Sequence, residues 1–131
     1  MQKVDQIRAV IGPGARVRLD ANRGWRLDEA VLFAQNIGMD RIEYIEEPLA
    51  DHGQIEAFSR RTDMPVAVDE TLADVLPEDM AGRVGIRYAV IRPLTAGGVT
   101  GYLKLLDAAL HAGLDVIPAA SFESGVGVTV L

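Results

Sequence analysis

The chain has 131 residues, of which 49% are hydrophobic, and this is enough apolar material for one globular domain with a core. Its 19 acidic side chains outnumber its 13 lysines and arginines, and the net charge of −6 argues against a nucleic-acid partner. The absence of cysteine excludes disulfides and thiolate metal sites, and no apolar run is long enough to cross a membrane. We therefore expect a cytoplasmic protein that binds neither membrane nor nucleic acid.

The spacing of the apolar residues changes repeatedly between the period of a helix and the period of a strand. Glycine and proline mark several of the boundaries between these segments. In chain order, the pattern predicts a helix at 4–11, a strand at 15–20, a helix at 26–38, a strand at 41–46, a helix at 53–62, a strand at 65–69, a weak helical turn at 77–82, a strand at 88–92, a helix at 98–113 and a strand at 114–118. The final residues, SGVGVTVL, could begin another helix.

Strict alternation of strands and helices predicts an α/β fold with a parallel sheet and crossover helices. Two architectures fit this pattern, a doubly wound open sheet and part of a (β/α)8 barrel. The first strand is not followed by a Gly-x-Gly-x-x-Gly turn, which leaves a dinucleotide-binding sheet with little support. We expect a partial barrel, because five strands cannot close one. Its outer strands would then be open edges, through which the chain could self-associate.

Three acidic side chains stand where successive predicted strands end: Asp20, Glu46 and Asp69. In a parallel barrel these strand ends converge, so three carboxylates there repel one another unless they are protonated or neutralised by a cation. Oxygen ligands with open positions suit Mg²⁺. The alternative is that each acid caps the next helix or lies in a solvated loop. Because all three follow apolar runs on successive strands, we favour the cation site.

Four motifs resemble the enolase superfamily, in the same order along the chain: LDAN at 19–22, IEEP at 45–48, VDE at 68–70 and VIRPLTAGG at 90–98. Within the superfamily they resemble the muconate-lactonizing subgroup. RLDANRGW and the later FES at 122–124 are most similar to its o-succinylbenzoate synthase family. The resemblance implies a partial (β/α)8 TIM barrel of about five βα units, which would be strands 3 to 7 of the family barrel.

The resemblance also implies a metal-assisted site in which Asp20, Glu46 and Asp69 bind Mg²⁺, with Mn²⁺ as a substitute. The metal would hold the carboxylate of a small-molecule substrate and stabilise the enediolate that forms when a lysine removes the neighbouring proton. Glu47 and Glu70 would lie behind the ligands and orient their neighbours.

Four further residues take smaller roles in this interpretation. Arg92 stands where the family usually has a lysine; it is a poor base and would stabilise charge, unless it is only a salt-bridge partner of the acids. Asn22 would bond near the metal or serve only the turn. Gly97 in TAGG would present its backbone to a substrate anion or simply form a tight turn. Ser121 resembles a serine that helps to hold the second carboxylate of the substrate.

The family's catalytic base belongs to a Lys-x-Lys motif that would fall before residue 1, outside the printed sequence. We therefore expect residues 1–131 to be an incomplete barrel domain that lacks the capping domain and the first two strands, and to be inactive alone. The implied reaction is a syn elimination of water on the route to menaquinone, catalysed by a carbon–oxygen lyase. The alternatives are a dipeptide epimerase, an N-acylamino acid racemase, a cycloisomerase, or a non-catalytic remnant or interaction fragment.

Overall fold

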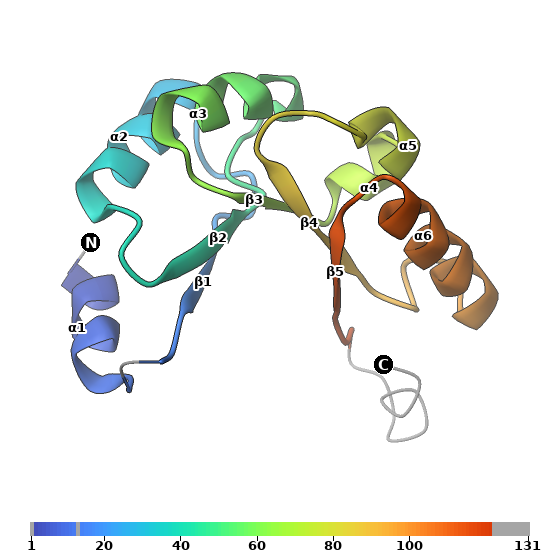
Figure 1. The fold of residues 1–131 in the computed structure, drawn as a ribbon, viewed down its shortest axis with the longest axis horizontal. Coiled ribbons are helices and arrows are strands. Elements are labelled where there is room, and N and C mark those ends of the chain that lie inside the picture. The colour runs from blue at the N-terminus through green and yellow to red at the C-terminus, as the bar shows by residue number, and fades with distance from the viewer. Residues whose placement is uncertain (1, 13, 122–131) are drawn as a thin grey trace.

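The computed structural model describes residues 2–12 and 14–121, and in this part of the chain helices and strands alternate (Figure 1). The elements are α1 (Gln2–Val10), β1 (Val17–Asp20), α2 (Leu27–Ile37), β2 (Ile42–Glu46), the 3₁₀ helix η1 (His52–Gln54), α3 (Ile55–Thr62), β3 (Val66–Val68), α4 (Thr71–Asp74), α5 (Pro77–Met80), β4 (Ile86–Ile91), α6 (Val99–His111) and β5 (Asp115–Pro118). None of these helices is long and apolar enough to span a membrane. The helix considered at the C-terminal end lies outside the described residues.

The five strands form one parallel sheet in which spatial order follows chain order, β1-β2-β3-β4-β5. The sheet curls into an arch, with the helices around its outer side and its inner side open (Figure 1). Consecutive parallel strands joined by helices on one side are the repeating unit of a (β/α)8 barrel. The expected partial TIM barrel is therefore confirmed, and the doubly wound alternative is wrong.

The five predicted strands and the longer helices are all present, with boundaries that differ by a few residues. The strands β3 and β4 end one residue before Asp69 and Arg92, so these two side chains stand in the loops just after the strands. The short helix α4 was not predicted, because four residues are too few to show a helical period.

The two faces of the sheet bury different side chains. The outer face packs against the helices and carries most of the core, with Ile45, Val66, Val68 and Ile91 at or near zero exposure. The inner face carries a smaller cluster of buried residues: Tyr44, Ala67, Tyr88 and Val90, with Ile117 and Ala119 packed against it. The pleat of a strand sends alternate side chains to opposite faces, which explains this division.

Strand register brings the acidic residues toward one another. Asp20 of β1 is paired directly with Glu46 of β2, and Glu46 is paired with Ala67 of β3. Asp69 lies two residues beyond Ala67, which returns it to the same face of the sheet. The three acids therefore project from the inner face at the carboxyl ends of three neighbouring strands, where barrel enzymes place their active sites.

Candidate active site

The three acids differ in how far they are removed from water. Asp69 is buried, with 8% of its surface exposed, and the Glu46 side chain is 13% exposed. Asp20 is exposed, and its Oδ1 atom accepts a hydrogen bond of 2.9 Å from the backbone N–H of Asn22. A gradient of burial therefore runs across the strand ends, from Asp20 on β1 to Asp69 after β3.

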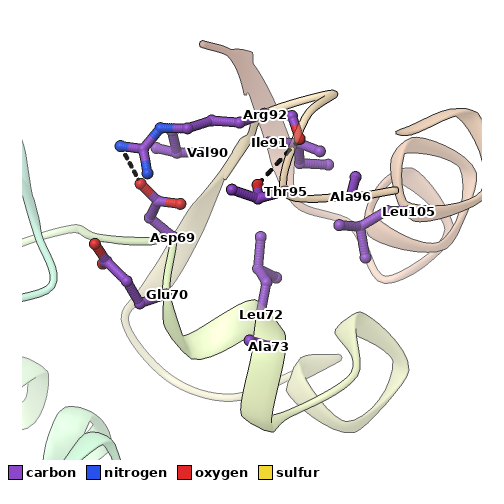
Figure 2. Close-up of a pocket in the computed structure, with 10 residues that line it drawn as sticks. All are labelled: Asp69, Glu70, Leu72, Ala73, Val90, Ile91, Arg92, Thr95, Ala96 and Leu105. Carbon is purple, nitrogen blue, oxygen red and sulfur yellow. Dashed lines mark hydrogen bonds and ion pairs between the residues drawn. The ribbon is translucent and has the colours of Figure 1, made fainter. Parts of the chain in front are cut away.

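The guanidinium of Arg92 lies between two of these acids. It forms an ion pair with Asp69, and its Nη2 atom is 3.9 Å from Oε1 of Glu46. Figure 2 shows Arg92 extending from the end of β4 so that its guanidinium meets the Asp69 carboxylate. The strand ends of β2, β3 and β4 thus place two carboxylates and one permanent positive charge within direct reach of one another.

Close approach of the acids changes their acidity. Burial, and then the negative charges of Asp20 and Asp69, raise the pKa of Glu46 to about 7, from an ordinary value of 4.5. Burial also raises the pKa of Asp69, although the charge of Arg92 opposes this rise. Because both carboxylates are destabilised as anions, one arginine does not fully compensate for their charge, and the site favours an additional cation.

The fit of a divalent cation can be judged from the atoms present. The Oδ2 atom of Asp69 is buried and, beyond its ion pair with Arg92, accepts no hydrogen bond among the described residues. The donors are all carboxylate oxygens, which are the ligands that Mg²⁺ prefers. Within residues 2–12 and 14–121, however, the side chains are not gathered into a cluster of three or more metal-binding groups. The donor atoms suit a magnesium ion in kind, but their described arrangement is not that of a metal site, and Arg92 supplies the positive charge between Glu46 and Asp69.

A pocket of about 210 Å³ borders the ion pair on the side of the helices. As Figure 2 shows, Leu72 and Ala73 of α4 face Ala96 and Leu105 across it, while Asp69 and Arg92 stand at one end. Its lining is largely apolar, so it suits the hydrocarbon part of a ligand, next to the end of the pocket that carries Asp69 and Arg92.

Glu47, the second acid of IEEP, has no exposed surface and is surrounded by hydrogen-bond donors. Its Oε1 atom accepts from the backbone N–H groups of Asp69 and Thr71, each at 2.8 Å. Its Oε2 atom accepts from the Thr71 hydroxyl at 2.8 Å and from Nε of Arg23 at 3.1 Å. Sequence reasoning gave no role to Arg23 or Thr71, because neither spacing nor hydropathy indicates which loop residue will face a carboxylate on another strand.

The structure places the remaining predicted residues as follows. Glu70 is exposed beside Asp69, and its charge contributes to the raised pKa of Asp69. Gly97 has a positive φ of 84°, and its N–H donates to the carbonyl of Leu94 within the turn that precedes α6. Ser121 is half-buried beyond β5, and the motif FES that follows it lies outside the described residues.

Comparison with known proteins agrees with this architecture. The model of the family described as "Enolase C-terminal domain-like" matches residues 1–130. The chain belongs to this enolase family. The resemblance that rested on LDAN, IEEP, VDE and VIRPLTAGG is thereby confirmed over nearly the whole sequence.

Several curated relatives of this enolase-family chain are named o-succinylbenzoate synthase. An o-succinylbenzoate synthase of Aliivibrio fischeri is 36% identical over 88% of the chain, and one of Thermobifida fusca is 31% identical over 96%. The chain spans only 36% and 39% of the length of these two proteins.

Solved structures give the same fold. The chain superimposes on MenC from Desulfotalea psychrophila with a TM-score of 0.80 at 20% identity, which covers 97% of the chain and 37% of that protein. It matches the L-Ala-D/L-Glu epimerase of Bacillus subtilis with a TM-score of 0.79 at 28% identity, over 98% of the chain and 37% of the epimerase. It matches an L-talarate dehydratase from Polaromonas, crystallised with Mg and L-glucarate, with a TM-score of 0.77 at 27% identity, over 98% and 35% of the two chains.

Proposed function

We propose that this chain is the metal-binding part of a Mg²⁺-dependent dehydratase of the o-succinylbenzoate synthase type. One observation carries the proposal: Glu46 and Asp69 project from the carboxyl ends of neighbouring parallel strands, with Asp20 in register beside them and Arg92 facing them. Several curated relatives above 30% identity are named o-succinylbenzoate synthase, which supports the choice of reaction. The 131 residues are proposed to form five units of a larger barrel domain.

In this proposal Asp20, Glu46 and Asp69 would hold the metal ion. The chemistry supplied by Mg²⁺ held there would be polarisation of a substrate carboxylate and stabilisation of the charge that develops on removal of the neighbouring proton. The residues of the chain supply the acidic ligands and hold Asp69 away from water. The base that removes the proton is proposed to lie outside these 131 residues.

Arg92 takes the role of charge stabilisation. A guanidinium has N–H donors and no acceptor, so Arg92, which is paired with two carboxylates, is a poor candidate for the base that takes the substrate proton. It can stabilise negative charge on the substrate, or stack over a ring. This argues for a dehydration that needs one base, and against epimerase or racemase chemistry, which needs a second base on the opposite face of the substrate.

Ligand binding by the purified chain tests the proposal. Isothermal titration with o-succinylbenzoate, the aromatic dicarboxylate in the name of the relatives, should show binding in Mg²⁺ that EDTA removes. Asp69→Asn should abolish this binding, because it removes a buried anionic ligand. Asp115→Asn is the matched control, since Asp115 is an exposed acid at the opposite end of the sheet. The dipeptide L-Ala-L-Glu should not bind.

Each other outcome has a definite meaning. Mg²⁺-dependent binding of the dipeptide instead of o-succinylbenzoate would favour the epimerase alternative. Failure to bind either ligand or metal would contradict the proposal and favour a non-catalytic remnant. In a dehydration assay we expect no turnover by the chain alone, and steady turnover that EDTA stops would overturn that expectation.

A further inference from the structure

The loops that follow β1, β2 and β3 are joined by one buried carboxylate. We call Arg23, Glu47 and Thr71 the Glu47 cluster: Arg23 follows β1, Glu47 follows β2, and Thr71 begins α4 after β3. Asp20 and Glu46 are the last residues of β1 and β2, and Asp69 is the first residue after β3. The cluster therefore connects the backbone segments that set where those acids stand.

The bonds of Glu47 reach the backbone next to Asp69. Oε1 accepts from the N–H of Asp69 itself and from the N–H of Thr71, so the peptide groups that precede Asp69 and Thr71 are both held. The main chain of Glu47 adds a bond of 3.0 Å to the carbonyl of Ala67. A carboxylate that accepts from the amides on either side of residue 70 restrains the backbone from which the Asp69 side chain projects.

The same residue also fixes the turn that follows Asp20. The N–H of Arg23 donates to the carbonyl of Glu47 at 2.7 Å, and the Arg23 side chain returns to Oε2 of Glu47. Nη2 of Arg23 reaches the Thr71 hydroxyl at 3.1 Å and Oδ2 of Asp74 at 3.3 Å. The loops after β1 and β3 are thus tied to each other through Glu47.

Backbone conformation at these positions is uncommon. Asn22, Arg23 and Glu47 have positive φ angles of 47°, 54° and 40°, in the left-handed region that residues other than glycine seldom adopt. Such conformations persist where the surroundings hold them in place, and they occur often at functional sites. Here they follow the two strands that end on Asp20 and Glu46; the Glu47 cluster supplies bonds that hold Arg23 and Glu47, and Asp20 holds Asn22.

We infer that Glu47, together with Arg23 and Thr71, is a positioning group for the acids of the site, and that metal affinity depends on it although it is not a ligand. The inference rests on the proposed function, because it assumes that Asp20, Glu46 and Asp69 bind the metal. Both side-chain oxygens of Glu47 are occupied by four hydrogen bonds, so Glu47 is not available to coordinate the metal ion. Loss of groups that orient metal ligands typically weakens metal affinity by about 10–100-fold.

The test measures Mn²⁺ affinity of the whole 131-residue chain by electron paramagnetic resonance, with Mg²⁺ as competitor. Glu47→Gln keeps the size of the side chain, but its amide nitrogen cannot accept from Arg23. We expect its Mn²⁺ dissociation constant to rise about 10–100-fold, and the spectrum of the bound ion to change as the ligand geometry loosens. Glu43→Gln is the matched control, because it removes another carboxylate–arginine pair from the same strand. Its affinity should equal that of the wild type.

Thr71→Val is the second variant, in case Glu47→Gln fails to fold. It keeps the shape and the backbone N–H of residue 71 and removes only the hydroxyl bonds to Glu47 and Arg23. We expect its dissociation constant to rise by about fivefold or more, because two hydrogen bonds of the Glu47 cluster are lost. Circular dichroism at the titration temperature shows that each variant is folded before its affinity is compared.

The possible results distinguish the proposed metal site from the positioning role of Glu47. A wild-type chain that binds no Mn²⁺ would overturn the proposed metal site, and with it this inference. A wild-type chain that binds Mn²⁺, with Glu47→Gln or Thr71→Val folded and equal to it in affinity and spectrum, would overturn the inference alone. An equal loss of affinity in Glu43→Gln would also overturn it, because the effect would not then depend on the Glu47 cluster.

Discussion

At the scale of single residues, the main feature of this chain is that neighbouring acids are held together at one end of a parallel sheet. Glu46 and Asp69 both have raised pKa values, because burial removes the water that would stabilise their anions. Arg92 compensates for part of this charge through its ion pair with Asp69. In the absence of a bound cation, buried neighbouring carboxylates destabilise the folded protein. Carboxylates with such raised pKa values cluster at functional sites.

The raised pKa of Glu46 predicts how stability depends on pH. Between the ordinary value of 4.5 and the folded value of about 7, the folded chain keeps a proton that the unfolded chain has released. The free energy of unfolding should therefore fall as the pH rises through this window, and level off above it. One pKa unit is worth about 1.4 kcal/mol, and water at the open inner face reduces the total to roughly 1–2 kcal/mol.

Urea unfolding in EDTA at pH 5, 6, 7 and 8 measures this loss of stability. Glu46→Gln should show a smaller decrease, because the titrating group is gone. Glu43→Gln should keep the full decrease: the hydrogen bond with Arg18 lowers the pKa of Glu43, which therefore titrates below this window. Equal slopes for wild type and Glu46→Gln would show that Glu46 does not titrate where we expect.

At the scale of elements, α6 illustrates a conflict between local preference and tertiary contact. Gly101 lies in its first turn, where replacement of glycine by alanine ordinarily stabilises a helix by about 1 kcal/mol. A Cβ atom at this position would lie only 1.7 Å from the carbonyl oxygen of Ala96, in the turn before the helix. The close approach of that turn to α6 therefore requires glycine.

We expect Gly101→Ala to destabilise the chain by roughly 1–3 kcal/mol, as overpacking against backbone usually does. Thermal unfolding followed by circular dichroism measures the change. Thr100→Ala alters the adjacent exposed residue of the same turn and should change stability by less than about 0.5 kcal/mol. A Gly101→Ala chain that is more stable than the wild type would mean that the turn before α6 can move away without cost.

At the scale of the whole molecule, the five strands form an open arch. Among the described residues, β1 and β5 each pair with a single neighbour, so both present unpaired backbone groups along one side. The apolar cluster on the inner face lies beside β5, because Ile117 and Ala119 pack against it. Unpaired strands next to apolar surface readily pair with another chain.

We predict that the purified chain self-associates through β5. Sedimentation velocity should show larger species that increase with protein concentration. Ile117→Lys should reduce them, since it places a charge on the edge strand beside the inner cluster. Leu110→Lys is the control, because Leu110 is an exposed apolar residue on α6 and should leave association unchanged. A single monomeric species at every concentration would contradict the prediction.

The sequence by itself determined the order and type of the main elements. Apolar spacing identified all five strands and the long helices, because burial of one face is a local property that repeats with the period of the element. Strict alternation then led to a parallel sheet, and acids at successive strand ends located the candidate site. What the sequence could not provide is any contact between residues that are far apart along the chain.

Only the tertiary structure decided how the site is held together. The bonds of Glu47 to Arg23 and Thr71 join positions separated by 24 residues in each direction, and no local pattern specifies such partners. The place of Arg92 between Glu46 and Asp69 likewise depends on the curl of the sheet, which brings side chains from β2, β3 and β4 together. Local periodicity determines which face a residue occupies, whereas packing between strands and loops determines which charges it meets and therefore its chemistry.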